Sequence, residues 1–246
     1  MIRLADISSS PPADADKKAL KDERDELLDE LYDLHRMMYA QEKHSLLVVL
    51  QGMDASGKDG TTRDVFGSCH PHGLRVNSFK VPTDEELAHD FLWRVHHHTP
   101  KKGYIQVFNR SHYEDVLVTR VLGLCDDVTA LERFELINAF ERILAHNGTV
   151  VLKFYLHISK DQQAIELQER MTDPTKHWKH NPKDWETRER WDEFMRYYED
   201  VFAHCSQPFP WHIIPADKNW YKEYLVARTV VETLRSFEMS YPPLED

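Results

Sequence analysis

The sequence has few cysteines, no long apolar run and no excess of positive charge, and each of these absences excludes a class of protein. The three cysteines, Cys69, Cys125 and Cys205, lie far apart, and none forms a Cys-x-x-Cys pair. We therefore expect buried thiols in a reducing cytoplasm rather than disulfides or a zinc site. No apolar run reaches the length of a transmembrane helix, and residues 1–16 lack the apolar core of a signal peptide, which predicts a cytoplasmic protein.

The balance of charge argues against two kinds of partner. The 246 residues include 31 Lys and Arg against 42 Asp and Glu, a formal net charge of −11. Such an excess of negative charge disfavours binding to nucleic acid and to anionic membranes, and we expect neither as a partner. A polyanionic substrate would therefore need a local cluster of positive side chains.

The chain is long enough for one domain with a substantial core. Hydrophobic residues make up 41% of it, it contains six tryptophans, and no internal repeat or linker divides it. We expect a single domain over 1–246, with a flexible tail over 1–12, where Ser and Pro are frequent, and an N-terminal helix over 13–42. The apolar stripe of that helix packs on the domain in one interpretation, and on a second subunit of a homo-oligomer in the other.

A continuous apolar run over 46–50 is followed by a glycine-rich turn and then by a helical pattern. The run predicts a strand buried on both faces, and Gly52-x-x-x-x-Gly57-Lys58 has the spacing of a phosphate-binding loop. Glycines let backbone N–H groups approach a phosphate, the helix N-terminus adds partial positive charge, and the lysine adds a full one. The pattern departs at Asp59, where a Ser or Thr usually ligates Mg²⁺. The alternative is an ordinary strand-to-helix turn with a surface lysine.

Strand and helix patterns alternate along the rest of the chain. Strand patterns cover 73–80, 104–108, 149–157 and 209–215. Helical patterns begin at 61–66 and cover 83–97, 129–146, 185–205 and 216–237, with one more helix capped by Ser159 and Gln162. Strands that alternate with helices predict a parallel α/β sheet.

Polar residues from Asn109 to Asp115 follow the strand predicted over 104–108. Open parallel sheets bind ligands at the carboxyl ends of their strands. Arg110 is suited to phosphate oxygens, and Glu114 or Asp115 is suited to Mg²⁺. The alternative is a polar helix cap without a ligand.

A positively charged segment covers 170–190. It contains six Lys and Arg against four Asp and Glu, a net charge of +2 in a chain of −11. A positive, irregular segment opposite a phosphate loop can act as a lid over anionic phosphates. The alternative is a solvated charged loop. The triplet 96–98 consists of histidines, but it has no further ligands at suitable spacing, and we expect a solvated helix end there.

Five blocks of residues occur in the order found in family-2 polyphosphate kinases, and they span nearly everything after residue 15. The blocks are Gly52–Gly60, Ser78–Thr83, Phe108–Glu114, Asp173–Lys179 and Pro215–Trp220. The chain therefore resembles that family, whose modified phosphate loop contains an aspartate, here Asp54. The resemblance implies an α/β fold of the P-loop kinase type: a five-stranded parallel sheet with helices on both faces and a helical lid. It also implies transfer of phosphoryl groups between inorganic polyphosphate and nucleotides with Mg²⁺, or Mn²⁺ in its place.

The resemblance extends to a class within the family. Some members have Asp-Arg-Ser-x-Tyr-Asn where this chain has Asn109-Arg-Ser-His-Tyr-Glu114. A glutamate at the last position resembles the class that phosphorylates both AMP and ADP. The expected reaction therefore moves the terminal phosphoryl group of polyphosphate to AMP or ADP, giving ADP and ATP. One alternative is an ATP-dependent nucleoside monophosphate kinase, and another is a non-catalytic phosphate-loop protein.

The resemblance assigns roles to individual residues. Asp54, Lys58 and Arg110 are the expected catalytic residues, and Asp54 and Glu114 are the expected metal ligands. The expected phosphate contacts are Met53, Ala55, Ser56, Gly57, Asp59, Gly60, Arg120, Arg170, Lys176 and Lys179. The expected nucleotide contacts are Lys80, Val81, Pro82, Asp84, Asn109 and Glu114. Because an acceptor phosphate oxygen is already ionised at neutral pH, Asp54 is expected to act as a ligand or orienting group rather than as a base.

Overall fold

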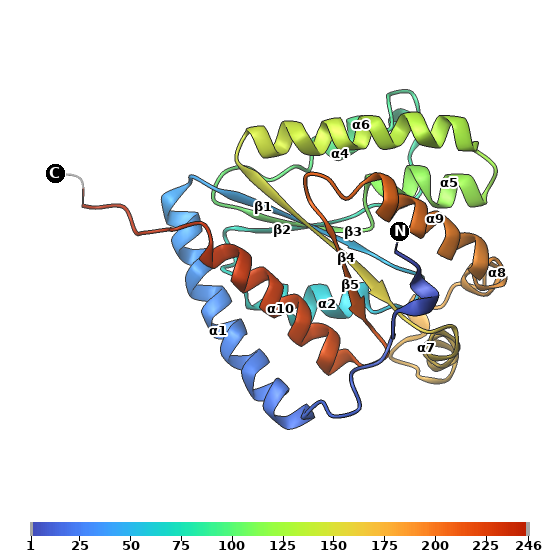
Figure 1. The fold of residues 1–246 in the computed structure, drawn as a ribbon, viewed down its shortest axis with the longest axis horizontal. Coiled ribbons are helices and arrows are strands. Elements are labelled where there is room, and N and C mark those ends of the chain that lie inside the picture. The colour runs from blue at the N-terminus through green and yellow to red at the C-terminus, as the bar shows by residue number, and fades with distance from the viewer. Residues whose placement is uncertain (1, 245–246) are drawn as a thin grey trace.

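Five parallel strands form one sheet, and the strand that precedes the glycine-rich loop lies at its centre (Figure 1). The strands are β1 (Ser45–Gln51), β2 (Leu74–Ser78), β3 (Ile105–Asn109), β4 (Thr149–His157) and β5 (Trp211–Pro215). Their order in this computed structural model, which describes residues 2–244, is β2-β3-β1-β4-β5. All residues of β1 are buried, because β3 and β4 flank it and helices cover the sheet. The predicted five-stranded parallel α/β sheet is confirmed.

The register of β1 and β3 brings two functional segments to the same edge of the sheet. The two strands pair from Leu46 opposite Ile105 to Leu50 opposite Asn109. Because the strands are parallel, the chain leaves both at their carboxyl ends, where open sheets of this kind bind ligands. The glycine-rich loop after β1 and the polar segment after β3 are therefore neighbours.

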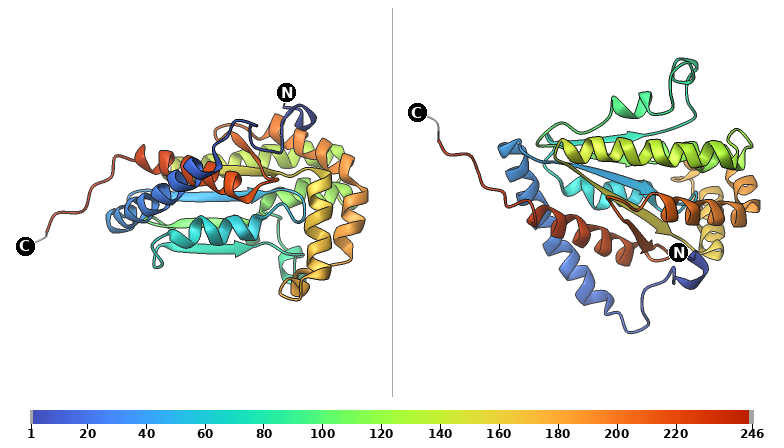
Figure 2. Two further views of the ribbon diagram at one scale, coloured as in Figure 1. Left: turned by 90° about the horizontal axis from the view of Figure 1, so that it is seen from below. Right: turned by 45° about the horizontal axis from the view of Figure 1, so that its top comes forward.

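Helices cover both faces of the sheet. They are α1 (Lys17–Gln41), α2 (Lys58–Asp64), α3 (Asp84–Leu87), α4 (Trp93–His96), α5 (Val118–Val121), α6 (Asp127–His146), α7 (Lys160–Thr172), α8 (Lys183–Glu189), α9 (Trp191–His204) and α10 (Asn219–Arg235). The 3₁₀ turns are η1 (Leu4–Asp6), η2 (Phe66–Ser68), η3 (His112–Val116) and η4 (His177–Lys179). Figure 1 shows α6 on one side of the sheet and α1, α2 and α10 on the other. Figure 2 shows α7 and α8 together at one end of the sheet. In the described part of the chain, no helix is both long and apolar enough to cross a bilayer.

Helix α1 begins at Lys17, later than the predicted start at residue 13. The Asp16 side chain caps it by accepting hydrogen bonds from the N–H groups of Lys18 and Ala19. Its apolar stripe is buried against α10. The stripe therefore packs on the domain itself, which is the first of the two interpretations given above.

The expected flexible tail over 1–12 is wrong for the residues described there. Leu4 lies in the core with 2% of its surface exposed, and its N–H donates to Glu199 Oε1 at 2.7 Å. The Ser9 hydroxyl donates to Asp217 Oδ2, also at 2.7 Å. A composition rich in Ser and Pro is typical of disorder, but these residues find buried and charged partners far along the chain, which composition does not reveal.

Two predicted helices are each divided in two. The pattern over 83–97 forms α3 and α4, because the Asp90 side chain accepts a hydrogen bond from the Leu92 N–H in the turn between them. The pattern over 185–205 forms α8 and α9, which meet at Arg190, where φ is −92° and ψ is 23°. The break at Arg190 lets α8 pack beside α7, while α9 buries its apolar face in the core.

Candidate active site

The loop between β1 and α2 has the backbone of an anion cradle. Gly52 and Gly57 have φ values of 148° and 90°, and a Cβ on Gly52 would lie 2.8 Å from the Leu156 carbonyl oxygen. Ala55 also has a positive φ, of 64°. Backbone conformations this costly cluster where a ligand approaches the main chain closely. Helix α2 begins at Lys58, three residues earlier than its predicted start, so the lysine is the first helical residue.

Lys58 is buried and folds back over the loop. Its Nζ donates to the carbonyl oxygens of Gly52 at 2.7 Å and Met53 at 3.0 Å. Burial, and after it the charge of Arg110, lower the pKa of Lys58 to about 8. These bonds use N–H donors of Lys58 Nζ that could instead bind the oxygen atoms of a phosphate. A phosphate bound in the loop would therefore replace the two carbonyl oxygens after a small movement of Nζ.

The segment after β3 turns a guanidinium onto the loop. Arg110 has a φ of 60°, in the left-handed region, and its Nη2 donates to Asp54 Oδ1 at 2.6 Å. The Ser111 hydroxyl accepts from the Tyr113 N–H and so caps the turn η3, which carries Glu114. Glu114, and to a smaller degree Asp54, raise the pKa of Arg110. Asp54 thus contacts the guanidinium at the loop, and the charge of Glu114 also acts on it.

Asp59 joins the end of β3 to the predicted lid. Asn109 Nδ2 donates to Asp59 Oδ1 at 2.7 Å, and Lys179 Nζ donates to Asp59 Oδ2 at 3.2 Å. Burial acts to raise the pKa of the Asp59 carboxyl, but these hydrogen bonds and charges outweigh it, and the pKa lies below its usual value. The residue that departs from the phosphate-loop pattern thus bridges the loop and the lid.

The predicted lid consists of the end of α7, the turn η4 and α8. Arg170 Nη1 donates to Asp184 Oδ2 at 2.7 Å, and Lys176 forms an ion pair with Glu169. The third lid cation, Lys179, differs from these two because its carboxylate partner, Asp59, belongs to the loop. Lys179 therefore joins the lid to the loop by an ion pair, while the charges of Arg170 and Lys176 are balanced within the lid helices.

The model of the family described as polyphosphate kinase 2 (PPK2) matches residues 14–242. The chain belongs to the polyphosphate kinase 2 family. The family predicted from the five blocks is thereby confirmed.

Two curated relatives and one solved structure are similar to this chain over most of its length. The chain is 51% identical over 216 residues to the AMP/ADP-polyphosphate phosphotransferase of Meiothermus ruber, a match that covers 87% of this chain and 81% of the relative. It is 39% identical over 228 residues to the ADP-polyphosphate phosphotransferase of Rhodopseudomonas palustris, covering 87% and 79% of the two chains. The crystal structure of polyphosphate kinase 2 from Arthrobacter aurescens superposes with a TM-score of 0.96 at 36% identity, over 100% of this chain and 89% of that one.

Arg120, predicted as a phosphate contact of the polyphosphate kinase site, is engaged elsewhere. Its guanidinium donates to Asp127 at 2.7 Å and Asp200 at 2.9 Å, and it lies 3.9 Å from the ring centre of Tyr197. These contacts join α5 to α6 and α9. Two carboxylates thus neutralise the charge of Arg120, as Asp54 does for Arg110, and the role of Arg120 as a phosphate contact stays a prediction.

The predicted nucleotide contacts fall into two groups. Asn109 and Glu114 lie beside the loop, as described above. The others follow β2 and are exposed or partly exposed, namely Lys80, Val81, Pro82 and Asp84. The Lys80 carbonyl accepts from Arg94 Nη1 at 2.9 Å, which anchors the start of this second group. The second group thus offers an accessible surface beyond the loop, and its role stays a prediction.

Two carboxylates of the site can hold a divalent cation. Within residues 2–244, no group of three or more His, Cys, Asp and Glu side chains has the arrangement of a metal site. In phosphoryl transfer, however, Mg²⁺ is usually held by one or two carboxylates together with substrate phosphates. Asp54 and Glu114, whose charges both act on Arg110, fit that ligand set. The histidines at 96–98 are exposed at the end of α4.

Sequence patterns do not point to two buried side chains behind the loop. Gln163 of α7 donates from Nε2 to the Asp54 carbonyl oxygen at 2.9 Å, and Lys222 of α10 donates from Nζ to the Ser56 carbonyl oxygen at 3.4 Å. Lys222 lies four residues before Val226 on the buried face of α10. A lysine in an apolar stripe is a signal that could have found it. Gln163 carries no such signal, since glutamine is common throughout helices.

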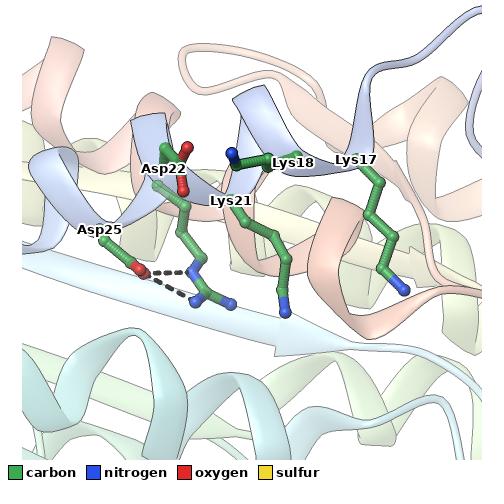
Figure 3. Close-up of a pocket in the computed structure, with 6 residues that line it drawn as sticks. Lys17, Lys18, Lys21, Asp22 and Asp25 are labelled. Carbon is green, nitrogen blue, oxygen red and sulfur yellow. Dashed lines mark hydrogen bonds and ion pairs between the residues drawn. The ribbon is translucent and has the colours of Figure 1, made fainter.

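A charged hollow lies at the start of α1, apart from the loop (Figure 3). It has a volume of about 450 Å³ and is lined by Lys17, Lys18, Lys21, Asp22, Arg24 and Asp25. Arg24 is bound to Asp25 and to Glu223 of α10. Because acidic side chains are mixed with the basic ones and no loop residue lines the hollow, we keep it apart from the candidate site.

Proposed function

We propose that this protein transfers the terminal phosphoryl group of inorganic polyphosphate to AMP and to ADP, giving ADP and ATP, with Mg²⁺ or Mn²⁺ as cofactor. The observation that carries the proposal is the contact of Arg110 with Asp54 at 2.6 Å, at the mouth of a loop that holds the buried Lys58. The names of the relatives support the choice of donor and acceptors. They do not favour an ATP-dependent monophosphate kinase.

The proposed mechanism rests on positioning and charge neutralisation. An ionised oxygen of the acceptor phosphate attacks the terminal phosphorus. The P–O bond to the remaining polyphosphate breaks, and its bridging oxygen leaves with the electron pair. Lys58 and Arg110 neutralise the charge that develops on the transferred group. No base is needed, because the attacking oxygen carries no proton at neutral pH.

The remaining roles follow from placement around the loop. Asp54 and Glu114 would hold Mg²⁺, which supplies further neutralisation of phosphate oxygens when bound. Backbone N–H groups over 53–60 would bind the terminal phosphates of the donor. Lys179, already joined to Asp59, would close the lid over them.

The proposal is tested with purified protein, AMP, Mg²⁺ and long-chain polyphosphate, with no ATP added. We expect ADP to appear first and ATP to follow, as measured by chromatography. Product from ADP but not from AMP would retain the donor and remove AMP from the acceptors. Activity that requires ATP as the donor would overturn the proposal.

The Glu114→Asn variant is expected to lower kcat/KM for AMP about tenfold more than for ADP, since one contact to a charged group is worth about 1.5–3 kcal/mol. AMP offers a single phosphate, so its position depends more strongly on each group near Arg110. Steady-state kinetics with each nucleotide measure the ratio. Glu135→Asn, at an exposed position of α6, controls for the change of side chain. An unchanged ratio of AMP to ADP use would remove Glu114 from acceptor selection.

The activity is expected to fall at alkaline pH as Lys58 loses its proton. With a pKa of about 8 in the free protein, kcat/KM for polyphosphate should decline about tenfold per pH unit above that value. The decline of kcat should occur at higher pH, because a bound phosphate stabilises the ammonium. In Lys58→Arg the guanidinium does not titrate in this range, so any activity that remains should lack this decline.

The same shift predicts the effect of pH on stability. The pKa of Lys58 is lower in the folded protein than its ordinary value of 10.5, so between about pH 8 and 10.5 the unfolded chain binds more protons at this residue. The contribution of Lys58 to the free energy of unfolding should therefore rise with pH over that window. Comparing urea midpoints of the wild type and Lys58→Met across it isolates this contribution.

A further inference from the structure

The Asp54–Ala55 peptide of the loop is held from outside by a lid helix. Gln163 of α7 is completely buried, and its Nε2 donates to the Asp54 carbonyl oxygen at 2.9 Å. Its Oε1 accepts from Arg188 Nη1 of α8 at 3.3 Å. Arg188 also donates to the Lys160 carbonyl at the start of α7. One side chain thus links the loop backbone to both helices at the base of the lid.

The hydrogen bond to the carbonyl determines where the next N–H points. In a trans peptide the C=O and N–H bonds point in opposite directions. Because the Asp54 carbonyl oxygen is bound on the side of α7, the N–H of Ala55 points away from α7. A phosphate-binding loop contacts its anion through backbone N–H groups of this kind.

The conformation at Ala55 needs such support. Its φ of 64° lies in the left-handed region, which is unfavourable for a residue with a Cβ. Without the bond from Gln163, rotation of this peptide would relieve that cost and turn the N–H away from the anion. The Asp54 side chain is bound separately by Arg110, so the carboxylate and the carbonyl group of Asp54 are held by different residues.

We propose that Gln163 is a positioning residue for the phosphoryl donor. It holds the Asp54–Ala55 peptide so that the Ala55 N–H faces the terminal phosphates. Because Gln163 also binds Arg188, the orientation of this peptide is coupled to the position of the helices at the base of the lid. The inference rests on the proposed function. It assigns to Gln163 an effect on the phosphate donor and none on the nucleotide acceptor.

The test compares two glutamines that are adjacent on α7. Gln163→Met keeps the length of the side chain and removes the donor. Gln162→Met is the matched control, since Gln162 Nε2 donates to Glu166 on the same helix rather than to the loop. Both variants are assayed for kcat, for KM of polyphosphate and of ADP, and for melting temperature.

We expect Gln163→Met to lower kcat/KM for polyphosphate about tenfold, the size of one lost hydrogen bond to a preorganised group, while KM for ADP stays the same. Gln162→Met should match the wild type in all three kinetic values. Unchanged polyphosphate kinetics in Gln163→Met, or an equal rise in KM for ADP, would overturn the inference.

A binding measurement keeps the inference separate from turnover and from folding. Calorimetry with tripolyphosphate, in the absence of nucleotide, should show weaker binding by Gln163→Met than by the wild type and by Gln162→Met. If Gln163→Met does not fold, Arg188→Met leaves the inner hydrogen bond in place and should weaken tripolyphosphate binding by a smaller factor. Wild-type binding by Arg188→Met in that case would overturn the inference. Tripolyphosphate binding by a wild type without polyphosphate turnover would count against the proposed function and not against Gln163.

Discussion

Replacing Lys58 with alanine is expected to lower kcat by two or more orders of magnitude. A preorganised charge aimed at developing negative charge is worth about 3–4 kcal/mol in sites of this kind, and about 1.4 kcal/mol corresponds to a factor of ten. Lys58 is preorganised in this sense, since its side chain is buried and bound to the carbonyl oxygens of Gly52 and Met53. The measurement is the rate of ATP formation from ADP at saturating polyphosphate.

The fold is expected to survive this change. Burial lowers the pKa of Lys58, which means that the folded protein holds the ammonium at a cost, and alanine removes that cost. The melting temperature and the circular dichroism spectrum should therefore stay close to those of the wild type. Near-wild-type turnover by Lys58→Ala would sink the assignment of the loop as the donor site.

The parts of the fold that follow from local patterns are those that the sequence predicts well. The strand expected over 149–157 has the same bounds in β4, because it is a long apolar run with a turn before it and a Ser cap after it. The tail over 1–12 and the division at Arg190 are different. The tail depends on Glu199 and Asp217, which are close in space and distant along the chain, whereas the break at Arg190 is marked by no Gly or Pro in the sequence.

The candidate site likewise contains residues that local patterns place correctly and residues that they do not. Asp54, Lys58 and Arg110 each belong to a short segment at the end of a strand, so spacing and residue type are enough to place them together. Gln163 and Arg120 show the limit of such reasoning. The first reaches the loop from a helix more than a hundred residues later, and the second has the charge of a phosphate ligand but is bound by carboxylates that the pattern does not reveal.

A buried ion pair lies beneath the segment that carries Arg110. Lys153 of β4 donates from Nζ to Glu141 Oε2 at 2.7 Å and to the Cys205 carbonyl at 2.7 Å, and both side chains are fully buried. The Tyr113 hydroxyl donates to Glu141 Oε1 at 2.7 Å. Since Tyr113 belongs to η3, three residues after Arg110, the ion pair holds the turn that directly follows Arg110.

Breaking this pair from one side is expected to have the largest effect on stability. Lys153→Met leaves the Glu141 carboxylate buried without its cation, which costs about 3–5 kcal/mol. The double variant Lys153→Met, Glu141→Leu removes both charges and should recover most of that loss, because an apolar pair needs no compensation. Urea unfolding of the wild type, both single variants and the double variant measures the coupling.

Activity then separates stability from positioning. The double variant restores the core but leaves the Tyr113 hydroxyl without its acceptor, so η3 loses the bond that orients it. We therefore expect kcat to remain several-fold below the wild type even where the free energy of unfolding has recovered. Tyr113→Phe should show the same reduction in kcat with a smaller loss of stability. Full activity in the double variant would mean that the buried pair serves the core alone and that Ser111 and the backbone suffice to hold Arg110 against Asp54.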